Sequence, residues 1–318
     1  MARILYILSS GGGLTGGQKM IVRHVEALCD LGFDAACYLT NKEPGLIEHR
    51  APLVKGRVAP EDVVVVADDA PETLQQCAGA PWRSVVFAQN PYHMARLGLE
   101  GIDALAAAGK LRFLAVAPRL SATLRRLHPE APVDLVPCFA DERRFGVHGT
   151  KQAQIAYTPR KRPHEAAAIK RFFKHLHPAH LPLPWVEVQN ATETEAAAAF
   201  AASSLFLSLS RLESVGMTTL EAMASGCLCA GFTGIGGNEY ATPYNGFWVP
   251  EDDCEAAADA LAEAARVAAE GGPELARRLE AGFETARAWS YEVFHQRLEA
   301  VWMGIAPEAR VRTPATVP

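Results

Sequence analysis

The sequence predicts an α/β protein of two domains, each built on a mostly parallel sheet. The chain has 318 residues, which is too long for one small core and suits two domains of about 150 residues each. Short apolar runs of strand length alternate with stretches of helical spacing, and this alternation restarts near residue 152. Strands that alternate with helices favour parallel sheets with helices on both faces.

The first half opens with a strand, a loop and a helix. Arg3–Leu8 is a short apolar run, and a glycine-rich loop follows from Gly11 to Gly17. From Gln18 to Leu31 the apolar residues recur at helical spacing, and Gly32 ends this helix. Further strands are predicted, separated in several places by helical stretches, at Asp34–Leu39, Asp62–Ala67, Arg83–Ala88, Arg112–Val116 and Val133–Pro137.

The second half repeats the alternation. Its predicted strands are Gln154–Thr158, Trp185–Val188, Leu205–Leu209 and Cys227–Phe232, and its predicted helices are Glu165–His175, Thr194–Ala202, Glu255–Glu270 and Pro273–Trp302. We place the domain boundary in the polar connection Gly146–Gln152, which gives domains 1–149 and 150–318. Two Rossmann-like domains of this kind present the carboxyl ends of their strands, where ligands bind, across a cleft. The last helix is expected to pack back toward the first domain.

Composition excludes several classes of protein. The formal net charge of −5 argues against general nucleic-acid binding, which requires a basic surface. The seven cysteines form no C-x-x-C pair and are typical of reduced thiols in a cytosolic protein. The N-terminal apolar run is too short for a signal peptide, and no segment approaches the roughly 20 apolar residues of a membrane span. We therefore expect a cytoplasmic protein, with peripheral contact at the inner face of the membrane left open.

The most informative stretch is Glu213–Gly226. It holds two glutamates, Glu213 and Glu221, and a glycine, Gly216, that leads into a short helix ended by Gly226. The first turn of a helix carries unpaired backbone N–H groups and the positive end of the helix dipole. A diphosphate or a sugar hydroxyl can therefore be held at Gly216 and Met217 while a carboxylate contacts neighbouring atoms.

The glycine loop of the first half allows a different interpretation. Gly11-x-Gly13-x-x-Gly16 matches the dinucleotide fingerprint, but that fingerprint also requires an acidic residue at the end of the second strand. Here the second strand ends Tyr38-Leu39-Thr40-Asn41. Nicotinamide binding is therefore disfavoured. A flexible loop that approaches an anion, or a tight turn from strand to helix, fits the same residues.

Motifs along nearly the whole chain resemble the retaining glycosyltransferases of the GT-B fold, specifically family 4. Glu213-Ser214-Val215-Gly216 resembles the E-x-F-G loop of that family, and Glu221–Gly226 resembles its E-A-M-A-x-G helix. The remaining matches are Gly236–Glu239 with G-G-x-x-E, Asn245–Val249 with N-G-x-x-V, Gly16–Gln18 with G-G-x-E, Leu31–Asp34 with L-G-H-x-V, Pro137–Phe145 with P-N-G-V-D-x-x-x-F, and Ala288–Tyr291 with F-S-W. Only one helix fits between Lys161 and Trp185, so the chain resembles a compact variant.

The resemblance implies a binding site for a nucleoside diphosphate sugar that needs no metal ion. Without metal, the departing diphosphate needs cationic side chains and backbone amides. The resemblance assigns the cations to Arg160 and Lys161, with Arg162 in reserve, although the family spaces its arginine and lysine further apart. Backbone amides are expected from Gly216, Met217, Gly236 and Gly237 in the second domain and from Gly16 and Gly17 in the first.

The two glutamates receive separate roles from the resemblance. Glu221 is expected to bind the ribose hydroxyls, since a carboxylate accepts well from two adjacent hydroxyls. Glu213 is expected to hold hydroxyls of the transferred sugar and to favour its cationic transition state. Backbone near Val188 and Gln189 is expected to contact the base, whose identity the sequence leaves open.

The acceptor side departs from the family. Many relatives carry a histidine after the fourth strand, whereas this chain reads Gln89-Asn90 and places Asn90 roughly there. An amide can bond a sugar hydroxyl but cannot act as a base. In the front-face mechanism proposed for the family, the departing phosphate takes the acceptor proton.

Two other clusters are interpreted as structural. Asp68-Asp69 follows a strand but lacks the D-x-D pattern of metal-dependent glycosyltransferases, which favours a helix cap or an acceptor contact. His175-x-His177-x-x-His180 lies in a proline-bearing connection without nearby cysteines or well-placed carboxylates, which favours a surface loop.

The sequence as a whole favours a retaining glycosyltransferase that uses a nucleotide sugar and a glycan or lipid-linked acceptor, without metal or other cofactor. A non-catalytic nucleotide- or glycan-binding relative of the same fold is the first alternative. A nicotinamide-dependent oxidoreductase is less favoured, and a nucleotide-sugar epimerase lacks motif support. The sugar, the acceptor and the oligomeric state stay open.

Overall fold

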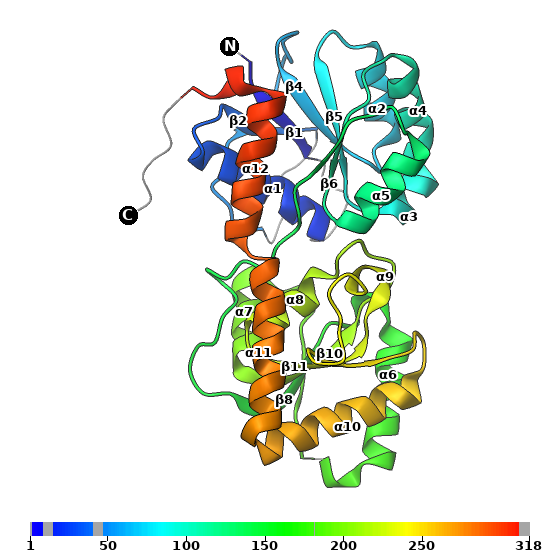
Figure 1. Ribbon diagram of the computed structural model, residues 1–318, viewed down its shortest axis with the longest axis vertical. Helices are drawn as coiled ribbons and strands as arrows, with labels where there is room; N and C mark the ends of the chain where they lie inside the picture. Colours follow the sequence, from blue (N-terminus) through cyan, green and yellow to red (C-terminus); the bar gives the residue numbers. More distant parts are fainter. Residues whose placement is uncertain (1, 9–14, 41–46, 181, 312–318) are drawn as a thin grey trace. The chain divides into compact units, whose positions relative to one another are not determined.

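The computed structural model describes residues 2–8, 15–40, 47–180 and 182–311. The chain divides into two compact units. The first unit comprises Met1–Cys138 and Phe294–Pro318, and the second comprises Phe139–Val293. Each unit has a parallel sheet covered by helices (Figure 1), which confirms the α/β class that the alternation of strands and helices predicts.

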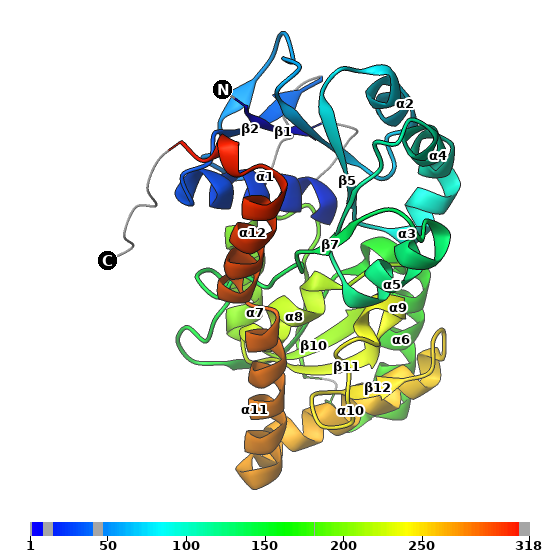
Figure 2. The ribbon, with the colours of Figure 1, turned by 45° about the horizontal axis from the view of Figure 1, so that its top comes forward.

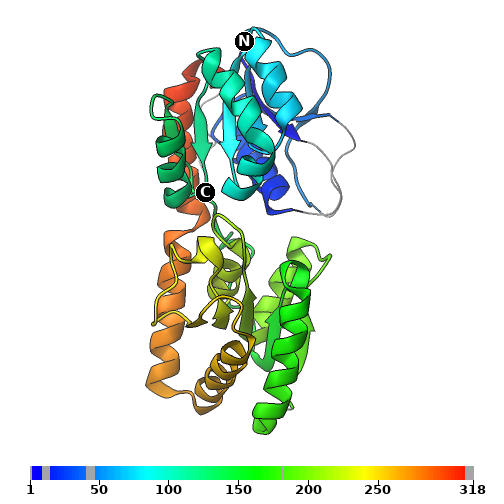
Figure 3. The same ribbon diagram turned by 90° about the vertical axis from the view of Figure 1, so that its right-hand side faces the viewer.

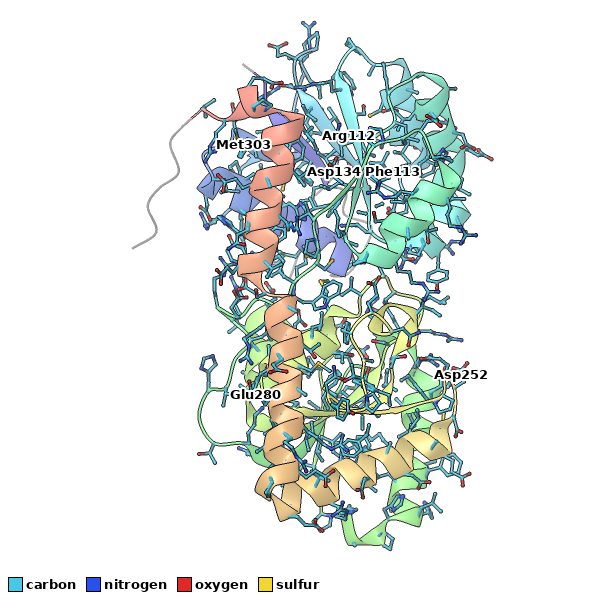
Figure 4. All side chains as sticks on the ribbon, in the orientation of Figure 1. Arg112, Phe113, Asp134, Asp252, Glu280 and Met303 are labelled. Atoms are coloured by element: carbon cyan, nitrogen blue, oxygen red, sulfur yellow. The ribbon has the colours of Figure 1, made fainter. Side chains whose placement is uncertain are left out.

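The sheet of the first unit has the strand order β3-β2-β1-β4-β5-β6-β7, and all its neighbouring strands are parallel. Its strands are β1 (Ile4–Leu8), β2 (Ala35–Leu39), β3 (Leu53–Val54), β4 (Val63–Ala67), β5 (Arg83–Ala88), β6 (Phe113–Ala115) and β7 (Val133–Leu135). The strands β1 and β4 are apolar and almost wholly buried, as expected of central parallel strands. Arg112, before β6, pairs with Asp134 of β7 at 2.8 Å; Figure 4 labels both residues.

The helices of the first unit are α1 (Gly16–Asp30), α2 (Pro71–Gly79), α3 (Pro91–His93), α4 (Leu99–Ala107), α5 (Pro118–Leu127) and most of α12 (Tyr291–Ile305), and a π-helical stretch covers Met94–Gly98. Thr15 caps α1 by accepting a hydrogen bond from the Gln18 N–H, and the Gln18 side chain accepts one from the Thr15 N–H. Figure 2 shows α2 and α4 side by side, and α2 also contacts β4.

The helix α12 completes the core of the first unit, although it lies far along the chain. The ring of Trp302 lies 6.2 Å from that of Tyr6 in β1, and the ring of Phe294 lies 4.9 Å from that of His24 in α1. After the helix, Arg310 pairs with Phe33 as an antiparallel bridge, and the Asp34 N–H donates to the Ala309 carbonyl at 2.8 Å. Residues 307–311 therefore pack on the first unit.

The sheet of the second unit has the order β12-β11-β10-β8-β9, again all parallel. Its strands are β8 (Gln152–Tyr157), β9 (Trp185–Glu187), β10 (Ser203–Leu209), β11 (Leu228–Phe232) and β12 (Phe247–Val249). Its helices are α6 (Pro163–Leu176), α7 (Glu193–Ala202), α8 (Met217–Ala224), α9 (Gly234–Gly237), α10 (Cys254–Glu270) and α11 (Gly272–Ala288), with short 3₁₀ turns at Pro159–Lys161 and Pro178–His180.

Alternate side chains of these strands face two helical layers. Ile155, Leu205, Leu207 and their neighbours on the same face pack with apolar residues of α6 and α10. The intervening residues face α7, α8 and α11; Phe206 meets Phe200 of α7 with ring centroids 5.4 Å apart. The green α6 and the gold α10 and orange α11 can be followed in Figure 3. The period-two alternation of β-strands thus divides the core into two layers.

Two features of the second unit differ from the sequence expectation. The helix expected at Pro273–Trp302 ends at Ala288 and a new helix begins at Tyr291. Between them Ser290 pairs with Ala140 as a parallel bridge, and the Ser290 hydroxyl accepts from the Val293 N–H at 3.3 Å, which caps the new helix. Residues 139–145 belong to the second unit, which begins at Phe139, before the expected connection Gly146–Gln152.

Other expectations concern chain-wide properties. All seven cysteines are free thiols, and five of them are buried. Among the described residues, no helix is both long and apolar enough to cross a membrane.

Candidate functional site

The candidate residues of the second unit lie at or near the carboxyl edge of its sheet. The 3₁₀ turn Pro159–Lys161 follows β8, Val188 follows β9, the loop with Glu213 follows β10, and the glycine turn α9 follows β11. Since all these strands are parallel, their carboxyl ends lie at one edge. The topology therefore brings residues that are distant in sequence to one side of the second unit.

Lys161 and Glu213 form an ion pair at this edge. The Lys161 Nζ lies 2.8 Å from the Glu213 Oε1, and the side chains are 31% and 24% exposed. Burial lowers the pKa of the Lys161 ammonium below its usual value; the Glu213 carboxylate opposes this shift, and the nearby Arg160 adds to it. The pair places a cation and an anion side by side, both within reach of solvent.

The other two cations of the basic run have different environments. Arg160 is exposed and lies in the same 3₁₀ turn as Lys161. Arg162 is buried: its Nε donates to the Ser210 carbonyl at 3.0 Å and its guanidinium pairs with Glu251 and Asp252. Arg162, the reserve cation of the sequence interpretation, is thus committed to contacts within the protein.

Gly216 begins α8 in the left-handed conformation, with φ 79° and ψ 53°. A Cβ there would lie 3.0 Å from the Ser210 Oγ and 3.1 Å from the Tyr240 Oη, so both conformation and space favour glycine. Met217 is the first residue of α8, which places the start of a helix directly after the loop that carries Glu213. Glu221 lies further along the same helix and is 6% exposed.

The glycine turn α9 presses on the loop that carries Glu213. A Cβ on Gly236 would lie 2.4 Å from both the Ser214 carbonyl carbon and the Val215 nitrogen, which are backbone atoms. Gly237 is less crowded, since its nearest neighbour would be the Thr233 Cβ at 3.3 Å. The G-G-x-x-E and E-S-V-G motifs, separate in sequence, are therefore in direct backbone contact.

Two residues support this arrangement without having been assigned to the site from sequence. The Tyr240 hydroxyl donates to the Gly216 carbonyl at 3.0 Å, and burial raises the pKa of this phenol. The Asn245 amide donates to the Tyr240 carbonyl at 2.7 Å and accepts from the Thr242 N–H at 2.8 Å. Asn245 belongs to the N-G-x-x-V motif in the sequence, whereas nothing around Tyr240 identifies its partner.

Val188 and Gln189 lie at the end of β9, beside β8. The Val188 N–H donates to the Tyr157 carbonyl at 2.9 Å, and Gln189 is exposed. Next to them, the Tyr157 hydroxyl donates to Glu187 at 2.7 Å. Val188 and Gln189 therefore lie at the same carboxyl edge of the sheet as Lys161, which is in the turn that follows β8.

In the first unit, the structure brings Gly17 and Gln89 together. The Gln89 Nε2 donates to the Gly17 carbonyl at 3.0 Å, and a Cβ on Gly17 would lie 2.5 Å from the Gln89 Oε1. Gly16 and Gly17 are the first residues of α1. Gly11 and Gly13, the other glycines of the fingerprint match, lie outside the described residues.

Asn90 and Asp68 lie where β5 and β4 end. The Asn90 Oδ1 accepts from the N–H groups of Tyr92 and His93 at 2.9 and 3.3 Å, so Asn90 caps α3. Asp68 accepts from the N–H groups of Gln89 and Asn90 at 2.9 and 3.0 Å. Burial raises the pKa of this carboxyl to about 7, and Asp69 adds to the shift. The N-cap residue of α2 is Ala70, so Asp68 supports the 89–90 turn instead of capping that helix.

In the described part of the chain, no group of three or more His, Cys, Asp or Glu side chains could hold a metal ion. In the histidine cluster, His177 Nε2 lies 2.7 Å from the Asp259 Oδ1, and His175 contacts the Arg171 carbonyl. His175 therefore lies in α6 and not in the expected loop, and Asp259 of α10 is a carboxylate partner of His177 that the sequence does not predict.

Comparisons with known proteins relate the second unit to glycosyl transferases and the whole fold to solved structures. A family described as glycosyl transferases group 1 matches residues 161–266, a segment that contains Lys161, Glu213, Glu221 and both glycines of α9. An alpha-1,6-glucosyltransferase of Actinobacillus pleuropneumoniae serotype 7 (strain AP76) is 26% identical over 252 residues, which cover 75% of this chain and 76% of that protein.

Solved structures share the fold over almost the whole chain. A sucrose-phosphate synthase of Thermosynechococcus elongatus aligns with a TM-score of 0.68 and 15% identity, covering 97% of this chain and all (100%) of that one. Anabaena HepE in complex with UDP-glucose aligns with a TM-score of 0.68 and 13% identity, covering 96% and 100%. The chain therefore has the GT-B fold of these glycosyltransferase structures, and its second unit carries the group 1 match.

Proposed function

We propose that this protein is a retaining glycosyltransferase that transfers a sugar from a nucleoside diphosphate sugar to a hydroxyl acceptor without a metal ion. The observation that carries the proposal is the Lys161–Glu213 ion pair, 2.8 Å long, beside the start of α8 and inside the segment that matches the glycosyl transferases group 1. A cation and a carboxylate side by side suit a reaction that develops negative charge on one fragment and positive charge on the other.

The departing diphosphate is the anion in this reaction. Lys161 and the exposed Arg160 supply positive charge, and the start of α8 at Gly216 and Met217 supplies the positive end of a helix dipole. Gly236 and Gly237 carry no side chains, so their backbone can come close to a diphosphate bound at the start of α8. A bound diphosphate would compete with Glu213 for Lys161 and release the carboxylate toward the sugar.

The two glutamates divide the remaining work. Glu213, at the solvent-accessible edge, holds hydroxyls of the transferred sugar and stabilises positive charge at its anomeric carbon. Glu221 accepts hydrogen bonds from the ribose hydroxyls of the nucleotide. In the first unit, the turn formed by Gln89 and Asn90 contributes to the acceptor side, with a glycan or a lipid-linked glycan as the acceptor class.

A UDP-sugar is the donor we would test first. Its support comes from HepE, solved with UDP-glucose, and from the alpha-1,6-glucosyltransferase relative. In the proposed retaining reaction, the departing phosphate accepts the proton of the attacking hydroxyl, so no protein base is needed on the acceptor side.

The test is turnover of UDP-glucose, GDP-glucose and ADP-glucose in the presence of EDTA, followed by proton NMR of the released sugar. Water can serve as the acceptor, so no acceptor needs to be known. We expect one nucleotide to be used and the α anomer to appear first. Glu213→Gln should abolish most of the turnover, whereas Glu255→Gln, an exposed carboxylate in the same unit, should leave it unchanged.

Three outcomes would contradict the proposal in different ways. The β anomer as first product would reject retention, and loss of turnover on adding EDTA would reject metal independence. Nucleotide binding without turnover of any donor, with oligosaccharide acceptors present, would favour a non-catalytic relative of the fold.

A further inference from the structure

Arg162 is the most enclosed cation at the carboxyl edge of the second sheet. Its side chain is 2% exposed. The Nε donates to the Ser210 carbonyl at 3.0 Å, one terminal nitrogen pairs with Glu251, and the other pairs with Asp252 and lies 3.5 Å from Glu165. The guanidinium carbon also lies 4.6 Å from the centroid of the Phe232 ring.

These partners come from the ends of several strands. Arg162 follows β8, Ser210 follows β10, Phe232 ends β11, and Glu251 and Asp252 follow β12. Figure 4 labels Asp252 in the loop between β12 and α10. One buried side chain therefore joins the carboxyl ends of four of the strands in this sheet.

Each link of Arg162 continues into the candidate site. Ser210 begins the loop that carries Glu213, and Arg162 directly follows Lys161. The Glu251 Oε1 accepts from the Gly234 N–H at 2.8 Å, and Gly234 begins α9. Gly236 of α9 lies against the Ser214–Val215 backbone. Arg162 is therefore connected to the Glu213 loop a second time, through Glu251 and α9.

The chemistry of these contacts requires arginine. A guanidinium presents its N–H donors in a planar fan, so it can bond a carbonyl and separate carboxylates at fixed angles, whereas a lysine ammonium is a single point of charge. Glu165 also meets a second cation, since Arg211 lies 3.6 Å from it. The positive charge of Arg162 is therefore balanced by its own carboxylate partners. Lys161 is paired separately, with Glu213.

We propose that Arg162 is a positioning residue for the donor site: through Ser210 and through Glu251 and Gly234, it fixes the two backbone segments 210–216 and 234–237 against each other. It touches no substrate. The inference rests on the proposed function for its kinetic consequence, but the positioning itself is a property of the free protein.

The test uses Glu251→Ala in the full chain. The Glu251 side chain is 38% exposed, so its removal is compatible with folding, and it deletes both the pair with Arg162 and the acceptor of the Gly234 N–H. Hydrogen exchange followed by mass spectrometry should show exchange at least tenfold faster in peptides that cover 210–216 and 234–237. Peptides from β8 and β10 should keep their wild-type rates. Arg162→Lys should give the same local pattern.

Two variants serve as matched controls. Asp252→Asn removes a carboxylate from the same guanidinium but leaves the Glu251–Gly234 link, and asparagine tolerates the positive φ of 67° at this position. Lys151→Met removes a half-buried cation that donates to the Phe200 and Ser203 carbonyls, near the amino ends of β8 and β10. Both controls should leave exchange in the two site segments within about twofold of wild type.

The kinetic arm measures hydrolysis of the donor identified for the wild type. If the Glu213 loop moves by about an ångström in Glu251→Ala, kcat at saturating donor should fall about 10- to 100-fold. The melting temperature of Glu251→Ala should be no lower than that of Lys151→Met. Faster exchange spread over the whole second unit, or unchanged exchange in both segments, would overturn the inference. A wild type that turns over no nucleotide sugar would reject the proposed function alone, because the exchange arm needs no ligand.

Discussion

Gly236 lies against the peptide bond that joins Ser214 to Val215, so closely that a Cβ would stand 2.4 Å from two of its backbone atoms. The contact connects the turn after β11 with the loop after β10, and that loop carries Glu213 one residue earlier. The position of Glu213 therefore depends on a residue that has no side chain, as well as on its own ion pair with Lys161.

Gly236→Ala should disturb the site much more than Gly237→Ala. The first change places a methyl group on rigid backbone and should cost about 1–3 kcal/mol of stability and about 10- to 100-fold in donor turnover. In Gly237→Ala the new methyl group would lie 3.3 Å from the Thr233 Cβ, and a small shift of that side chain is enough to accommodate it. Thermal melts and donor hydrolysis measured on both variants test this order, and equal effects would refute it.

Glu213→Gln should move the alkaline limit of nucleotide binding to lower pH. Burial lowers the pKa of Lys161, and the Glu213 carboxylate opposes that shift. Removing the carboxylate therefore lowers the pKa of Lys161 further, so the ammonium that holds the diphosphate is lost at a lower pH. Isothermal titration with UDP between pH 7 and pH 10 measures the limit. Glu255→Gln is the control, and a limit that stays or moves upward would contradict the assignment.

Asp68 should make the protein less stable as pH rises toward neutrality. Its folded pKa is raised to about 7 from 3.8, so the folded state binds more protons than the unfolded state between these values. This contribution is complete below the unfolded pKa and is lost as pH rises through the folded one, at up to about 1.4 kcal/mol per pH unit. Asp68→Asn keeps an acceptor oxygen and should remove this contribution to the pH dependence. Denaturant melts from pH 4 to 8 measure it, with exposed Glu100→Gln as the control.

His24 should act in the opposite direction. It is fully buried between Phe87 and Phe294, at ring distances of 4.6 and 4.9 Å, and burial lowers its pKa to about 3 from 6.5. The stability that it contributes is present above the unfolded pKa and is lost as pH falls toward the folded one, at up to about 1.4 kcal/mol per unit.

The two slopes oppose each other between about pH 4 and 6.5, so the wild type should vary little there. His24→Phe should expose the slope of Asp68, with stability falling as pH rises. Asp68→Asn should expose the slope of His24, with stability rising. The same sign of slope in both single variants would contradict this account.

The fold was predictable because its signals are local and repeated. Strands such as β1, β4 and β10 are buried on both faces of a parallel sheet, so nearly all their residues are apolar and the sequence shows them as continuous apolar runs. The break between α11 and α12 was missed because Trp289 and Ser290 are compatible with a helix. Contacts with residues 140–142 mark the break: Ser290 pairs with Ala140, and the Glu142 carboxylate accepts from the N–H groups that begin α12. These contacts depend on residues far away in sequence.

The candidate site was predictable as a set of motifs, but their partners were not. The run Arg160-Lys161-Arg162 shows three cations, and its spacing does not say which one enters the core. The structure separates them: Arg160 is exposed, Lys161 pairs with Glu213 and Arg162 is buried. Tyr240, which supports Gly216, carried no sequence signal, because a single tyrosine in a loop is compatible with many roles.

The central claim is that the carboxyl edge of the second sheet binds a nucleoside diphosphate. The most direct measurement is isothermal titration of UDP, GDP and ADP, without metal, into the wild type, Lys161→Ala, Glu221→Ala and the control Lys151→Met. We predict that one nucleotide binds the wild type and the control equally, and that its Kd rises about 10- to 100-fold in each of the other two variants, as expected for loss of a charged hydrogen-bond partner. Equal affinity in all four proteins, or no binding of any nucleotide to the wild type, would contradict the claim.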